Sequence, residues 1–160
     1  MSHVHWAGDV DCKRVKVGQK VIVVGGGLTG AESAIALAME GKEVTLLEMM
    51  GPEALLNGAS LINKFSLQSL LMKHHIKVVT NTKLEEITEK GIKTINSKFQ
   101  WKEYEADTVV LALGMRPRRD KIEELRHLIP ETEVYVIGDG HQVGNVYAAV
   151  HAGFDTATEI

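Results

Sequence analysis

Residues 21–32 read Val21-Ile22-Val23-Val24-Gly25-Gly26-Gly27-Leu28-Thr29-Gly30-Ala31-Glu32, a β-branched apolar run followed by a glycine turn and small residues. The spacing Gly-x-Gly-x-x-Gly between a strand and a helix is typical of a turn that binds the pyrophosphate of a dinucleotide. The first glycine permits a tight turn, the second admits phosphate close to the backbone, and the third lets the helix pack on its strand. The helix start offers N–H groups to the anion. The expected pyrophosphate-binding residues are Gly25, Gly26, Gly27, Leu28, Thr29 and Gly30.

Glu48 is the candidate ribose-binding residue. Residues 44–47 are mostly apolar and predict a second strand, and Glu48 follows at about the 20-residue spacing at which this kind of site carries an acid. A carboxylate accepts the protons of both ribose hydroxyls, whereas a 2′-phosphate would face a like charge at a cost of roughly several kcal/mol. We therefore expect NAD(H) rather than NADP(H). The alternative is an exposed acid at a strand end with no ligand.

The composition is that of an ordinary globular chain. Its 160 residues are 44% hydrophobic and 24% charged, with a net charge of -3, which fits one domain and argues against nucleic-acid or anionic membrane partners. Cys12 is the only cysteine, so an internal disulfide, a Cys-x-x-Cys pair and a cysteine-ligated metal site are excluded. The histidine pairs lack neighbouring acids, so we expect no metal site. No signal peptide or long apolar run is present, and a cytoplasmic location is expected.

Hydrophobic periodicity predicts a βαβαβ unit. Strands are expected at residues 20–24, 43–47 and 76–80, and helices at residues 29–40 and about 61–72. The short connections favour a parallel sheet with right-handed crossovers. Residues 1–19 show no clear period, and we interpret them as a lead-in or a linker.

The second half of the chain changes character. Short strands at residues 83–88, 91–96 and 98–104 predict an antiparallel meander, and a buried strand is expected at 108–114. A helix near 121–127, a strand at 134–137 and a helix from about 145 follow. We expect an α/β, Rossmann-like three-layer fold with strand order 3-2-1-4, and with the 134–137 strand beside strand 4 if the isolated chain folds compactly. The expected division is a nucleotide-binding domain at 20–117 and a return segment of an incomplete FAD-type domain at 118–160.

These motifs together resemble a known family. The glycine turn, the strand-end acid and the meander are followed by Leu111-Ala112-Leu113-Gly114-Met115-Arg116-Pro117 and by Val136-Ile137-Gly138-Asp139. This order is similar to that of pyridine nucleotide–disulfide oxidoreductases. Within that group the chain most resembles the C-terminal region of NADH:flavin oxidoreductases related to 2,4-dienoyl-CoA reductase, enoate reductase and trimethylamine dehydrogenase. The resemblance covers nearly the whole chain.

The resemblance implies roles for individual residues. The three motif glycines would cradle the NAD pyrophosphate, Glu48 would hold the adenosine ribose, Glu32 would lie near the nicotinamide, and Gly114 would border the same cleft. In a full-length parent only, Gly138 and Asp139 would meet the ribityl or phosphate region of FAD, or an ADP in its place. Without the resemblance, Glu32 is equally a helix-start acid favoured by the macrodipole, and Asp139 a turn or N-cap residue.

The resemblance also implies parts that this sequence does not contain. No flavin-type glycine turn precedes residue 21, and neither the FMN-binding barrel nor its iron–sulfur cysteines are present. We therefore expect an NAD(H)-binding domain or fragment that delivers hydride from NADH to a flavin, lacks its flavin-binding half and barrel domain, and is not catalytic alone. A stand-alone nucleotide-binding or sensing module is the alternative. An adenosyl-cofactor methyltransferase is disfavoured by the meander. The sequence predicts neither the reduced substrate nor the oligomeric state.

Overall fold

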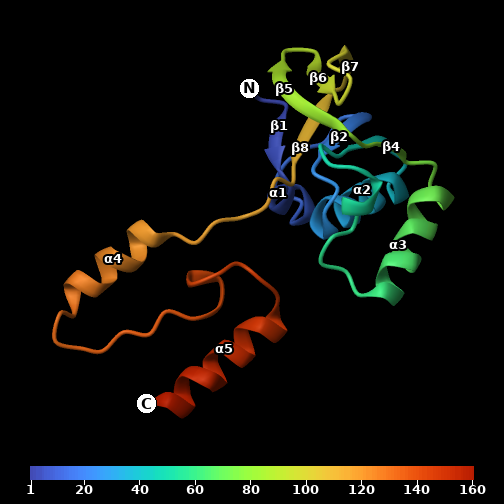
Figure 1. Ribbon diagram of the computed structural model, residues 1–160. Coiled ribbons are helices and arrows are strands. Elements are labelled where there is room, and N and C mark those ends of the chain that lie inside the picture. The colour runs from blue at the N-terminus through green and yellow to red at the C-terminus, as the bar shows by residue number, and fades with distance from the viewer. The chain divides into compact units, whose positions relative to one another are not determined.

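Five parallel strands form the sheet at the centre of residues 1–113 (Figure 1). The computed structural model describes residues 1–160, which divide into two units, 1–113 and 114–160. The strand order is β1 (Val4–Trp6), β8 (Thr108–Leu111), β2 (Lys20–Val24), β3 (Glu43–Leu47) and β4 (Lys77–Val79). Strands 1, 2 and 3 of the prediction are β2, β3 and β4, and strand 4 is β8. The expected order 3-2-1-4 is therefore confirmed.

The sheet lies between a helical layer and a second sheet. The helices are α1 (Ala7–Asp11), α2 (Leu28–Met39) and α3 (Leu61–Lys73), and a 3-10 turn at Pro52–Ala54 precedes α3. The antiparallel meander is β5 (Thr82–Thr88), β6 (Gly91–Asn96) and β7 (Trp101–Glu105).

Strand β2 shows how the layers are joined. Side chains alternate across a strand, so Val21 and Val23 join the core cluster of α2, whereas Ile22 and Val24 join the cluster that contains Ile92 of the meander. None of these four β2 residues is more than 4% exposed. The prediction of an α/β, Rossmann-like three-layer fold is confirmed.

Residues 1–19 contain two elements that the sequence interpretation missed. Strand β1 pairs in parallel with β8, with Val4 opposite Val109 and Trp6 opposite Leu111. Helix α1 follows directly and buries Ala7 and Val10 in the helix-side core. The segment is thus part of the nucleotide-binding fold. Its three-residue strand carries too short a pattern to read, and its partner strand comes about 100 residues later.

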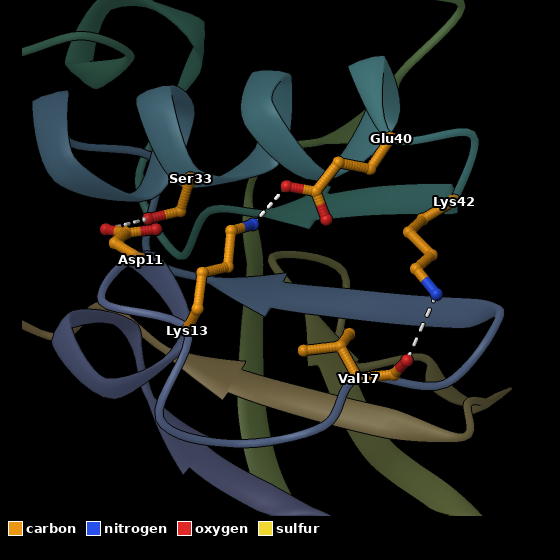
Figure 2. Close-up of polar contacts among 6 residues, drawn as sticks. All are labelled: Asp11, Lys13, Val17, Ser33, Glu40 and Lys42. Atoms are coloured by element: carbon orange, nitrogen blue, oxygen red, sulfur yellow. Dashed lines mark hydrogen bonds and ion pairs between the residues drawn. The ribbon is translucent and has the colours of Figure 1, made fainter.

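Polar contacts tie this segment to α2 and to the loop after it (Figure 2). The buried Ser33 hydroxyl donates to Asp11 at 2.9 Å, and Lys13 pairs with Glu40 at the end of the same helix. The ammonium of Lys42 donates to the carbonyl oxygen of Val17 at 3.1 Å. These contacts hold α1 and the chain after it along one face of α2.

The second unit contains two helices and no strand. Helix α4 (Arg119–Leu128) and helix α5 (Val146–Glu159) confirm the two expected helices, and η2 (Gly138–Gly140) is a single 3-10 turn between them. The prediction of a strand at residues 134–137, beside β8, was wrong. A strand requires a hydrogen-bonded neighbour, and β1 takes that edge of β8. None of the helices combines the length and the apolar character that a membrane-spanning segment requires.

Candidate functional site

A pocket of about 400 Å³ lies where β2, β3 and β8 reach their carboxyl ends. Within the sheet, β3 pairs with one edge of β2 and β8 with the other, so the carboxyl end of β2 is a topological switch point, where open α/β sheets bind ligands. We call it the carboxyl-end pocket. It is lined by Val24, Gly25, Gly27, Leu47, Glu48, Met49, Thr82, Lys83, Leu84, Ala112 and Leu113.

Gly25 and Gly30 have structural roles in the turn. Gly25 has a φ of 109°, and a Cβ there would lie 2.4 Å from the carbonyl oxygen of Ala112. A Cβ on Gly30 would lie 1.8 Å from the carbonyl oxygen of Gly25. Only glycine therefore permits this turn and the close approach of α2 to it.

Gly27 differs from the other two glycines. It is the N-cap of α2, its φ of -67° suits any residue, and a Cβ there would meet no atom within 4 Å. No side chain caps α2, so the N–H groups of its first turn remain available to a ligand. The open space beside Gly27, at an uncapped helix start, fits the phosphate cradle expected from the sequence. Leu28 and Thr29 belong to this first turn but do not line the pocket.

The Glu48 carboxylate is fixed by two backbone donors. One oxygen accepts from the N–H of Gly26 at 2.7 Å, and the other from the N–H of Met50 at 2.8 Å. Two carboxylate oxygens have about four acceptor positions in total, so one position on each remains for a ribose hydroxyl. Glu48 thus links the glycine turn to the end of β3, and its half-exposed side chain faces the pocket.

The start of β5 completes the pocket, and sequence reasoning missed it. The N–H of Thr82 donates to the carbonyl oxygen of Glu48 at 3.0 Å, which brings Thr82, Lys83 and Leu84 to the pocket. A signal was present in the sequence. Because β4 is parallel to β3 and the link from β4 to β5 is very short, β5 has to begin at the carboxyl end of β3.

Glu32 and Gly114 are placed differently from the glycine turn. Glu32 is exposed on α2 and lines a separate pocket of about 290 Å³, together with Asp11, Lys13 and Glu40. The structure does not bring Glu32 to the carboxyl-end pocket, and its place near a nicotinamide stays a prediction. Gly114 has a φ of 85° and directly follows Leu113, which lines the carboxyl-end pocket.

Gly138 and Asp139 form a turn in the second unit. Gly138 has a φ of 55°, and the Asp139 carboxylate accepts from the N–H of Gly144 at 3.0 Å. Asn145, not Asp139, caps α5. Both turn residues line a pocket of about 220 Å³ at the start of α5. Their contact with a flavin nucleotide stays a prediction.

Tyr135, near this turn, donates its hydroxyl to the Glu133 carboxylate at 2.9 Å, and this bond raises the pKa of Tyr135 above its usual value of 10.0. Tyr135 is half-exposed and lines none of the pockets described above, so it has no part in the candidate site.

Known proteins are similar to this chain over most of its length. A cinnamate reductase of Clostridium sporogenes is 34% identical over 159 residues, which are 98% of this chain and 23% of the relative. An NADH oxidase of Thermoanaerobacter brockii is 33% identical over 144 residues, or 89% of this chain and 21% of the relative. The solved structure of a 2-naphthoyl-CoA reductase has a TM-score of 0.85 at 30% identity and covers 98% of this chain.

The chain therefore spans less than a quarter of the length of these relatives. Residues 3–153 match the family described as "Pyridine nucleotide-disulphide oxidoreductase", whose members bind FAD and NAD(H). The nucleotide-binding Rossmann fold and the glycine turn at its switch point agree with that match. This chain belongs to the pyridine nucleotide-disulphide oxidoreductase family.

Proposed function

We propose that this chain is the NAD(H)-binding domain of a flavin-dependent oxidoreductase and that it delivers hydride from NADH to a flavin. The observation that carries the proposal is the carboxyl-end pocket. It joins the open space beside Gly27, the uncapped start of α2 and the anchored carboxylate of Glu48. These are the parts that a dinucleotide needs for its pyrophosphate and its adenosine ribose.

The chemistry of the proposed reaction requires positioning more than side-chain catalysis. A bound nicotinamide supplies the hydride, and the protein holds its ring against the acceptor. In this proposal, the first-turn N–H groups of α2 bind the pyrophosphate and Glu48 accepts from the ribose hydroxyls. A flavin-binding half and an FMN-binding barrel would come from the rest of a longer cytoplasmic protein. Gly138 and Asp139 would contribute to the FAD site of that protein.

Two glycine substitutions test the proposal. Gly27→Ala adds a methyl group in open space, so the melting temperature should stay within about 2 °C while NADH affinity falls by about tenfold or more. Gly30→Ala adds a methyl group 1.8 Å from a backbone oxygen, so it should destabilise the fold. Intrinsic fluorescence during NADH titration and thermal unfolding measure the two effects.

The two variants serve as matched controls for each other. Both add one methyl group within the same turn, but only the change at Gly27 should affect binding without affecting stability. NADH affinity unchanged in Gly27→Ala would contradict the placement of the pyrophosphate. Tighter binding of S-adenosylmethionine than of NADH by the unmodified chain would contradict the class of cofactor.

A further inference from the structure

We propose that the ion pair between Lys83 and Glu85 makes the carboxyl-end pocket selective for NADH over NADPH. The inference rests on the proposed function, because it concerns the ribose end of the same site. Lys83 is the only lysine or arginine among the residues that line this pocket. It is therefore the one lining residue whose charge suits a 2′-phosphate.

Backbone geometry brings Lys83 to the region of Glu48. The N–H of Thr82 donates to the carbonyl oxygen of Glu48 at 3.0 Å, and the N–H of Asn81 donates to the carbonyl oxygen of Met50 at 2.8 Å. These two bonds fasten the start of β5 across the end of β3. Lys83 follows directly, and it lines the same pocket as Glu48, the residue expected to bind the ribose.

The charge of Lys83 is already paired. Its ammonium lies 2.7 Å from a carboxylate oxygen of Glu85, two residues along β5, and the Glu85 side chain is 30% exposed. Glu85 does not line the pocket. It holds the ammonium and adds a second negative charge next to it. A nucleotide carrying a 2′-phosphate would thus meet the Glu48 carboxylate in a pocket whose one lining cation is already paired.

Glu85 is therefore a positioning residue that acts on cofactor choice through Lys83. In Glu85→Gln the side chain keeps its size and loses its charge, which frees the Lys83 ammonium. We expect the Kd for NADPH to fall by about threefold, in line with the strength of exposed charge pairs, and the Kd for NADH to stay within about twofold. The gain for NADPH should shrink as salt is raised from about 0.05 to 0.5 M.

The chain offers a matched control on the same strand. Glu86 pairs with Lys93 at 3.1 Å, and neither residue lines the pocket. Glu86→Gln makes the same change in net charge but frees Lys93, which does not line the pocket. It should therefore leave the ratio of the NADH and NADPH affinities unchanged. In the double variant Lys83→Gln/Glu85→Gln, the gain for NADPH should disappear, because the freed cation is gone.

The experiment is calorimetric titration of the 160-residue chain and its variants with NADH and with NADPH. An unchanged affinity ratio in Glu85→Gln, an equal shift in Glu86→Gln, or a gain that persists in the double variant would each overturn the inference. Failure of the unmodified chain to bind NADH would instead overturn the proposed function. The two failures are therefore distinguishable.

Discussion

The Glu48 side chain has one structural task and one proposed task, the binding of the ribose. Each carboxylate oxygen accepts one backbone N–H, from Gly26 and from Met50, so the side chain holds the glycine turn against the end of β3. The remaining acceptor positions suit two ribose hydroxyls. A turn fixed before the ligand arrives loses less conformational entropy on binding, and this favours affinity as well as selectivity.

Substitution of Glu48 should reveal both tasks. Glu48→Arg should shift preference toward NADPH by more than tenfold, or about 1.4 kcal/mol, because a cation replaces the anion that faces the 2′ position. The same variant should melt at a lower temperature, since two backbone donors lose their acceptor. Glu48→Gln keeps one amide oxygen as an acceptor and should show a smaller change in each property.

Parallel titrations with NADH and NADPH, together with thermal unfolding, measure these effects. If the ratio of the Kd values for NADPH and NADH is unchanged in Glu48→Arg, the acid does not face the ribose.

At the scale of single residues, the sequence predicted the positions of residues that belong to a motif with fixed local spacing. Gly25, Gly30 and Glu48 lie one after another along a strand, turn, helix and strand, so their places could be predicted. Lys83 reaches the pocket because Thr82 bonds to the backbone of Glu48, a residue far away in the sequence. No local motif marks this contact, and it could be inferred only from the order of the strands and the short link between β4 and β5. Glu32 shares the motif but lines the α1 side of its helix, because its direction depends on the turn geometry of α2.

At the scale of elements, β1 and α1 extend the sheet and cover part of its core. Ala7 and Val10 of α1 are buried, whereas the pair formed by Lys13 and Glu40 is solvent-exposed. Buried apolar side chains stabilise a fold far more than exposed ion pairs do. The attachment of this segment therefore depends on its apolar contacts and on strand pairing.

Two substitutions compare these contributions. Val10→Ala should lower the free energy of unfolding by about 2 kcal/mol, because it leaves a gap in the core beside α2. Lys13→Ala should change the free energy of unfolding by less than about 0.5 kcal/mol, because its partner is an exposed carboxylate. Urea unfolding of each variant measures the difference. A loss in Lys13→Ala as large as that in Val10→Ala would contradict this ranking.

The elements that could be predicted are those with their own periodicity. Strands β2 and β3 were placed at their observed bounds and α2 to within one residue, because apolar runs and the glycines that follow or precede them mark these elements locally. Strand β1 was missed and the strand at 134–137 was wrongly expected for one reason. Whether a short apolar segment becomes a strand depends on the partner edge available to it, and that edge is set by the rest of the fold.

At the scale of the whole molecule, the two units differ in burial. All the buried hydrophobic residues belong to residues 1–113, and neither α4 nor α5 contains a buried residue. The carboxyl-end pocket is formed entirely by the first unit. The proposed function therefore assigns nucleotide binding to that unit, and it assigns to the second unit a contribution to the flavin site of a longer protein.

The most direct test is an NMR titration of the isotope-labelled chain with NADH. We expect the largest amide shift changes at Gly26, Gly27, Leu28, Glu48 and Met49, in a saturable one-site pattern that Gly27→Ala weakens. Amides of α4 and α5 should show little change. Saturable shifts confined to the second unit, or to the α1 side of α2 around Glu32, would contradict the placement of the cofactor in the carboxyl-end pocket.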